Sequence, residues 1–106
     1  MEQKSIEDAA EFYVFSSYGI PERLYFVLLG SIRSGHIRDN MYAKITMNST
    51  LTLSVKINEV TKIEYAGDKS VDTLLITYCE DKEWYDNLLA MNVYSETVKI
   101  EIEGAD

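Results

Sequence analysis

The fold of this chain is decided by residues 24–45, LYFVLLGSIRSGHIRDNMYAKI. The stretch predicts one long strand, a tight turn at Ser34-Gly35, a short piece of strand, a second turn at Asp39-Asn40 and another strand. Gly35 and Asn40 are residue types that tolerate positive φ. Two such reversals five residues apart are typical of antiparallel β structure. None of these residues forms a catalytic constellation, so the stretch predicts a fold and not a reaction.

The length and composition are those of a single globular domain. The chain has 106 residues, of which 46% are hydrophobic and 26% are charged. Its longest apolar run, Leu24 to Leu29, is far shorter than the ~20 residues of a membrane span. Residues 1–8 lack the basic and apolar regions of a signal peptide. Cys79 is the only cysteine, which excludes an intrachain disulfide and favours a reducing compartment, so we expect a cytoplasmic protein.

The N-terminal part predicts an arm followed by a strand. Residues 1–11 are polar and acidic and are expected to form a helical or frayed arm. Residues 12–15, FYVF, are the aromatic and β-branched types that strands prefer. Turn residues follow at 16–19 and at Pro21, so we expect the strand to end there. The expected organisation is an arm over 1–11 and one β-barrel domain over 12–106.

Alternation of apolar and polar residues predicts three more strands, over 51–57, 71–79 and 95–103. The alternation slips after Ile57, so Asn58-Glu59 is expected to be a bulge or a sharp bend that curls the sheet. The residues expected in the core are Val27, Leu29, Ile32, Ile45, Leu53, Val55, Ile57, Leu74, Ile76, Val98 and Ile100.

Residues 80–90 differ from the rest because their apolar residues are spaced for a helix. Trp84 and Leu88 are four residues apart, and Asp81 is a residue type that caps a first turn. We predict one short helix here, placed over one end of the fold. Six or seven antiparallel strands, short turns and one helix together predict an all-β protein, a closed or nearly closed β-barrel.

The pattern G-x-I-x-x-G-x-I-x-x-N-M-x-A-x-I over residues 30–45 resembles the start of the β-barrel that forms domain 2 of translation GTPases such as elongation factor Tu. Asn40 stands where that family usually has its second turn glycine, and asparagine is the next-best residue there. Residues 54–64 resemble the family's bent strand and residues 92–102 its closing strand.

This resemblance implies a barrel that stands alone. The phosphate-binding pattern G-x-x-x-x-G-K-[ST] of the family's nucleotide domain does not occur in the chain. In the family, the barrel helps to hold the acceptor end of aminoacyl-tRNA or contacts ribosomal RNA. No residue with such a role is carried over to this chain, because a shared fold does not transmit a function.

Two groups of residues are candidate binding sites. Arg33, His36 and Arg38 lie around the predicted turns and would form an anion-binding spot. Polar, exposed residues are also ordinary at turn tips, and we favour that interpretation. Trp84 and Tyr85 lie among acidic residues, a composition typical of protein-binding hot spots. The alternative, which we favour, is that Trp84 packs over the end of the barrel while the acids face water.

The sequence predicts no catalytic residue, no metal site and no cofactor. His36 is the only histidine, and no third group is identifiable that would orient it toward Cys79 as a nucleophile–base pair. One histidine and one cysteine are also too few for a soft-ligand metal site. A single cysteine in an apolar strand is usually a small buried hydrophobe.

The charge narrows the class of partner. The formal net charge is −8, and residues 51–106 hold five lysines against twelve acids. Such a chain repels phosphate backbones, so nucleic acid is not an expected partner. No membrane contact is expected either, because no apolar run is long enough to span one. We expect a non-enzymatic module that binds another macromolecule, a basic protein in the first place. Two alternatives stay open: a translation accessory that contacts RNA or a ribosomal protein through residues 33–44, and an acidic inhibitor of the immunity or antitoxin type. The oligomeric state is not predicted.

Overall fold

The structure, a computed structural model, describes residues 9–48, 51–67 and 70–102. Within these ranges it has seven strands and one helix. Their bounds are β1 (Ala9–Ile20), β2 (Tyr25–Ser34), β3 (Tyr42–Asn48), β4 (Leu51–Lys56), β5 (Glu59–Glu64), β6 (Val71–Tyr78), α1 (Lys82–Ala90) and β7 (Glu96–Glu101).

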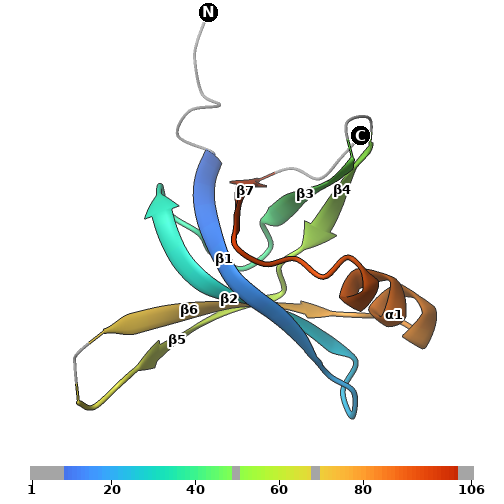
Figure 1. Cartoon of the computed structure of the whole chain (residues 1–106), viewed down its shortest axis with the longest axis horizontal. Helices are drawn as coiled ribbons and strands as arrows, with labels where there is room; N and C mark the ends of the chain where they lie inside the picture. Colours follow the sequence, from blue (N-terminus) through green and yellow to red (C-terminus); the bar gives the residue numbers. More distant parts are fainter. Residues whose placement is uncertain (1–8, 49–50, 68–69, 103–106) are drawn as a thin grey trace, which may run out of the picture.

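All seven strands belong to one antiparallel sheet in the order β4-β3-β7-β1-β2-β6-β5. Figure 1 shows β1 and β2 as a long curved pair that crosses the molecule, with β5 and β6 on one side and β3, β4 and β7 on the other. The mostly antiparallel β class predicted from the sequence is therefore confirmed. In the described part of the chain no ladder joins the two edge strands β4 and β5, so strand pairing does not close the sheet into a barrel.

The bend expected at Asn58-Glu59 is present between β4 and β5. The Ile57 N–H donates to the Met41 carbonyl at 2.7 Å, and the Asn40 N–H donates to the Ile57 carbonyl at 2.7 Å. The next residue changes partner, because the Asn58 N–H donates to the Ile76 carbonyl at 2.8 Å. The chain therefore passes at residues 57–58 from the side of β3 to the side of β6.

Strand β1 is longer than the sequence predicts. The prediction of a turn at residues 16–19 is wrong. Ser16 to Gly19 pair with β2, and the chain reverses at Pro21 to Leu24. The pairing with β2 satisfies the backbone of these turn-type residues, and a shift of register between Val14 and Ser16 bends the strand. At its other end the strand starts at Ala9, three residues before the expected domain boundary, and residues 1–8 of the expected arm lie outside the described ranges.

The double turn after β2 is confirmed at both predicted positions. Gly35 has φ of +78° and Asn40 has φ of 73°. The piece of strand expected between them is not formed. Instead the Arg38 N–H donates to the Met41 sulfur at 3.3 Å, and the side chain of Ile37 is buried in the core.

The main core lies on one face of the sheet. It takes residues from β1, β2, β3, β4, β6, β7 and α1, including the fully buried Phe12, Phe26 and Leu88. Five of the predicted core residues belong to it, Ile45, Val55, Ile57, Val98 and Ile100, while Ile32 and Leu53 pack against it half-buried. Four others, Val27, Leu29, Leu74 and Ile76, are not members of this cluster. They alternate with its residues Phe26, Leu28 and Leu75 along β2 and β6, so they face the opposite side of the sheet.

Helix α1 begins as the sequence predicts. The Asp81 carboxylate accepts a hydrogen bond from the Trp84 N–H at 2.9 Å and caps the first turn. Tyr85 and Leu88 are the buried residues of the helix, and Lys82 forms an exposed ion pair with Asp86 four residues later. The helix therefore packs onto the core through one face and presents Trp84 beside the end of β6.

Candidate functional site

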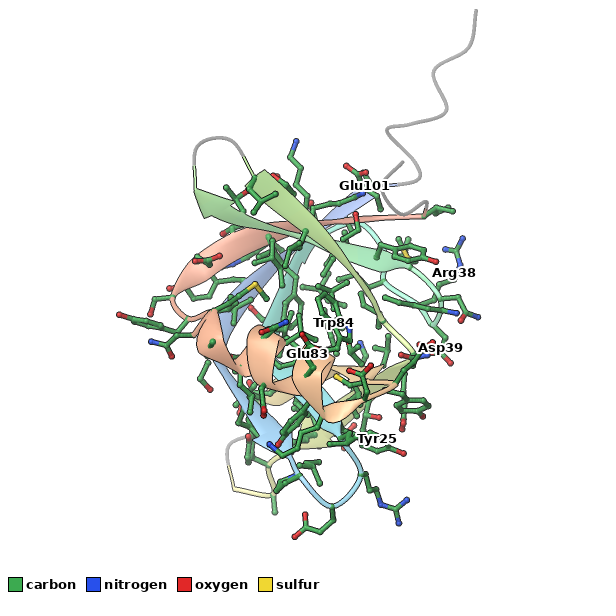
Figure 2. The ribbon with its side chains drawn as sticks, turned by 90° about the vertical axis from the view of Figure 1, so that its right-hand side faces the viewer. Tyr25, Arg38, Asp39, Glu83, Trp84 and Glu101 are labelled. Carbon is green, nitrogen blue, oxygen red and sulfur yellow. The ribbon has the colours of Figure 1, made fainter. Side chains whose placement is uncertain are left out.

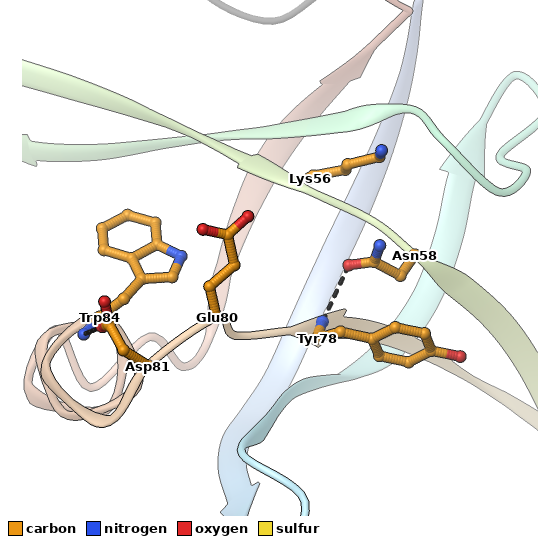
Figure 3. A pocket seen from close by; sticks show the side chains of 6 residues that line it. All are labelled: Lys56, Asn58, Tyr78, Glu80, Asp81 and Trp84. Carbon is orange, nitrogen blue, oxygen red and sulfur yellow. Dashed lines mark hydrogen bonds between the residues drawn. The ribbon is translucent and has the colours of Figure 1, made fainter.

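A cleft of about 430 Å³ opens where β6 leads into α1, next to the bend between β4 and β5. Figure 3 shows its side chains, which come from two separate segments of the chain. They are Lys56, Asn58, Tyr78, Glu80, Asp81 and Trp84. The first two come from the end of β4 and the bend, and the other four come from the short stretch around the start of the helix.

The backbone beneath the cleft is held by four hydrogen bonds. The Asn58 carboxamide oxygen accepts from the Tyr78 N–H at 2.8 Å, which ties the bend to the end of β6 (Figure 3). The Thr77 hydroxyl donates to the Lys56 carbonyl at 2.6 Å on the same side. The Cys79 N–H donates to the Leu24 carbonyl at 2.9 Å, and the Asn58 N–H bonds to β6 as described above. Three of these contacts tie residues 56–58 to the end of β6, and the fourth ties Cys79 to the start of β2.

One wall of the cleft is formed by the helix and the residue before its cap. Trp84 is half-buried, and its backbone N–H is held by Asp81. Glu80 is exposed, and in the view of Figure 3 its carboxylate rises between the Trp84 indole and the Lys56 side chain. Within the described part of the chain, neither Glu80 nor Lys56 has a side-chain hydrogen bond or an ion pair. Both charged groups are therefore available to a ligand.

Tyr78 lines the cleft at the end of β6, and Figure 3 shows its ring pointing away from Trp84. Its hydroxyl donates a 2.8 Å hydrogen bond to a carboxylate oxygen of Glu59, and its ring stacks on Tyr25 with centroids 4.5 Å apart. The hydrogen bond to Glu59, together with burial and the nearby negative charge, raises the pKa of Tyr78 to about 12. Tyr78 is therefore a neutral aromatic surface at physiological pH, held by contacts on two sides.

The cleft combines aromatic surface with an excess of negative charge. Its charged groups are two carboxylates, Glu80 and Asp81, and one ammonium, Lys56. A cation placed against an indole ring and beside a carboxylate is stabilised by both. The arrangement therefore suits a guanidinium or ammonium group at the end of an aliphatic chain.

Cys79 and His36, the residues on which nucleophilic chemistry would depend, lie in different surroundings. Cys79 is only 8% exposed, and burial raises the pKa of its thiol, so the reactive thiolate is disfavoured. His36 lies exposed in the loop between β2 and β3. Over the ranges that the structure describes, no group of three or more histidine, cysteine, aspartate or glutamate side chains is arranged to hold a metal ion.

The structure places Arg33 near the end of β2, and His36 and Arg38 in the loop that follows. The Arg33 guanidinium lies 4.8 Å from the centre of the Tyr13 ring, and no hydrogen bond or ion pair among the described residues links it to His36 or Arg38. Figure 2 shows Arg38 at the outer edge of the molecule, away from Trp84. The neighbouring Asp39 accepts a hydrogen bond from the Val60 N–H at 3.0 Å, which adds a negative charge to this loop.

The two aromatic candidates have different places. Trp84 lines the cleft, whereas Tyr85 is 5% exposed and its ring lies against Gly19 in the core. Sequence reasoning did not single out Lys56, Asn58 or Tyr78 as site residues. The one sequence feature near these residues is the change in apolar–polar alternation after Ile57. It predicts a bend, but it does not predict that the bend packs against the end of β6.

No helix in the described residues is long and apolar enough to cross a membrane. Comparison of the chain with protein-family models, with curated proteins and with solved structures finds no match in any of the three.

Proposed function

We propose that this protein is a non-enzymatic, protein-binding module that holds a basic segment of its partner in the cleft beside α1. The observation that carries the proposal is the cleft itself, where the half-buried Trp84 lies with two acidic residues, Glu80 and Asp81, around one space. An arginine or lysine side chain is the protein group that matches both features at once.

We expect the cleft alone to contribute a modest binding free energy, and the net charge of the chain to speed association. A cation over the Trp84 ring contributes about 0.5–2 kcal/mol, depending on how well it is desolvated. The net charge of −8 attracts basic proteins over a distance and raises their association rate, an effect that salt weakens. Lys56 adds a donor for a carbonyl or carboxylate of the partner, so the cleft selects a peptide segment over a free cation.

We also propose that the sheet is a nearly closed barrel of the kind found in domain 2 of translation GTPases. The bend at residues 57–58, which links the two edge strands, and the positive φ angles of Gly35 and Asn40 support this interpretation. The free, buried thiol of Cys79 supports a cytoplasmic location.

Trp84 is the only tryptophan of the chain, so its fluorescence reports on the cleft alone. The test is a fluorescence titration with a short, end-blocked peptide that carries two arginines, against the same peptide with citrulline in place of arginine. We expect a saturable change with the arginine peptide only, weakened by added salt and by Glu80→Gln. The matched control is Glu83→Gln, which removes an exposed charge from the first turn of the same helix.

An equal response in wild type and Glu80→Gln, or no response to arginine, would overturn the proposal. An RNA oligonucleotide is the second probe. Tight, salt-sensitive RNA binding that is lost in the double variant Arg33→Gln and Arg38→Gln would instead favour the translation accessory. Inhibition of a basic toxin by the whole chain would favour the immunity-type alternative.

A further inference from the structure

The sheet has a second apolar face, opposite the main core. Register places side chains of β1, β2, β6 and β5 in rows across this face. The three central rows are Ser16, Leu29, Leu74 and Thr61; Tyr18, Val27, Ile76 and Glu59; and Ile20, Tyr25 and Tyr78. Eight of these eleven side chains are aliphatic or aromatic. We call this surface the outer apolar face.

This face buries a small core of its own. Val27 is fully buried and Ile76 is 8% exposed, yet neither belongs to the main cluster. Their neighbours Tyr18 and Tyr78 are 41% and 43% exposed. In the described part of the chain no strand or helix lies over this face, because α1 meets the other side of β1, where Tyr85 touches Gly19. Strands with one solvated face normally alternate apolar and polar residues, so an apolar outer face indicates an interaction surface.

The large side chains of this face are held in place before any partner binds. Tyr25 and Tyr78 are stacked. Tyr13 alternates along β1 with the core residues Phe12 and Val14 and so lies on the same side of the sheet as this face. Its ring meets Phe15 edge to face with centroids 5.7 Å apart, and the Arg33 guanidinium lies over it. The Tyr78 hydroxyl is also bonded to Glu59. Ordered aromatic side chains lose little conformational entropy when they are covered, which favours binding.

We propose that the outer apolar face docks a partner protein through apolar side chains flanked by lysine or arginine. The charge of this face and of the whole chain selects this occupant. Glu59 and Asp72 lie on this face, where they accept hydrogen bonds from Tyr78 and Tyr65, and the whole chain carries −8. A second copy would bring the same carboxylates and the same net charge into a self-complementary contact, which is unfavourable. The inference shares with the proposed function the basic character of the partner and the residue Tyr78, which borders both surfaces. It otherwise concerns different side chains and a different kind of contact.

The test uses photo-cross-linking in the cell from which the chain comes. Benzoylphenylalanine is placed in the full chain at Tyr18 on the outer face, at Trp84 in the cleft, or at Lys99 as an exposed control on β7. We expect Tyr18 to cross-link to a different protein at a segment with an excess of lysine and arginine, and Lys99 not to do so. The photo-reactive residue is aromatic like Tyr18, and circular dichroism checks that each variant folds.

Several outcomes overturn the inference. These are a cross-link to a second copy of the chain, a contact segment without basic residues, and a Tyr18 yield no higher than that of Lys99. Cross-linking at Trp84 alone contradicts docking on the outer apolar face and agrees with binding in the cleft. Cross-linking at Tyr18 alone contradicts binding in the cleft and agrees with docking on the outer apolar face. As a second measurement, Tyr18→Glu should weaken the captured complex about tenfold or more with an unchanged thermal midpoint. Tyr94→Glu, at an exposed tyrosine between α1 and β7, should not.

Discussion

The Tyr78 hydroxyl of β6 donates a 2.8 Å hydrogen bond to the Glu59 carboxylate, the first residue of β5 after the bend. The contact joins the two surfaces described above, because Tyr78 lines the cleft and also stacks on Tyr25 in the outer apolar face. Glu59 accepts a second hydrogen bond from the Thr61 hydroxyl at 3.1 Å, so its carboxylate is held from its own strand as well.

This contact predicts a pH dependence of stability. The hydrogen bond to Glu59 raises the pKa of Tyr78 from 10.0 to about 12, so between these pH values the folded chain keeps a proton that the unfolded chain has released. The contribution is therefore fully present below pH 10 and is lost as pH rises toward 12. We expect the thermal midpoint of wild type to fall more steeply over this window than that of Tyr78→Phe. Parallel curves for the two proteins would show that the bond does not persist in solution.

Gly35 predicts a large effect of a small substitution. Its φ is +78°, and an added Cβ would lie 2.7 Å from the Ala9 carbonyl oxygen and 2.9 Å from the Ala10 Cα. Gly35→Val should lower the free energy of unfolding by about 1–2 kcal/mol or more, from backbone strain alone. Asn40→Gly, at the other left-handed position, should be neutral or slightly stabilising. Urea unfolding of the two variants measures both, and an unchanged midpoint for Gly35→Val contradicts the prediction.

The helix cap gives a third prediction. Asp81→Ala removes the carboxylate that accepts from the Trp84 N–H and should cost about 0.5–2 kcal/mol of stability. Asp81→Asn keeps an acceptor at the cap and should recover most of this loss. Thermal unfolding followed by circular dichroism compares the three proteins, and equal destabilisation by both substitutions would assign the effect to charge and not to capping.

The packing of α1 gives a fourth prediction. Leu88 is fully buried in the main core, so Leu88→Ala should cost about 2–5 kcal/mol through lost burial and the cavity that remains. Asn87→Ala, at the exposed neighbouring position on the same helix, is the control and should change stability by about 0.5 kcal/mol or less. Denaturant unfolding measures both, and similar small losses would mean that the helix does not pack on the core in solution.

Cys79 gives a fifth prediction through its burial. The thiol is 8% exposed, and burial raises its pKa, so a thiol reagent should modify the folded chain slowly at neutral pH. The same reagent should react quickly once denaturant unfolds the chain. Rapid modification of the folded chain would mean that the end of β6 opens readily.

Much of the local structure could be predicted from the sequence because its causes are local. The left-handed angles at Gly35 and Asn40 follow from residue types that tolerate them, and the cap at Asp81 follows from a side chain that reaches a backbone N–H three residues ahead. The bend after Ile57 was also visible, because alternation of apolar and polar residues changes phase there.

The errors arose where distant pairing outweighed local preference. Residues 16–19 are turn types, yet β2 offers them backbone partners along their whole length, and the strand continues to Ile20. Val27 and Ile76 were expected in the main core because they are apolar and lie in strands. Apolar character does not tell which face of a strand is covered when both faces carry apolar residues.

By itself, then, the sequence determined the antiparallel class, the two left-handed turns, the bend and the helix cap, because each depends on residues a few positions apart. Only the tertiary structure decided that Trp84 lines one cleft with Lys56 and Asn58, and that Val27 faces away from Phe26 on a second apolar face. Those relationships depend on the pairing of strands far apart in the chain. The sequence carries the pattern of each strand but not the register that brings the strands together.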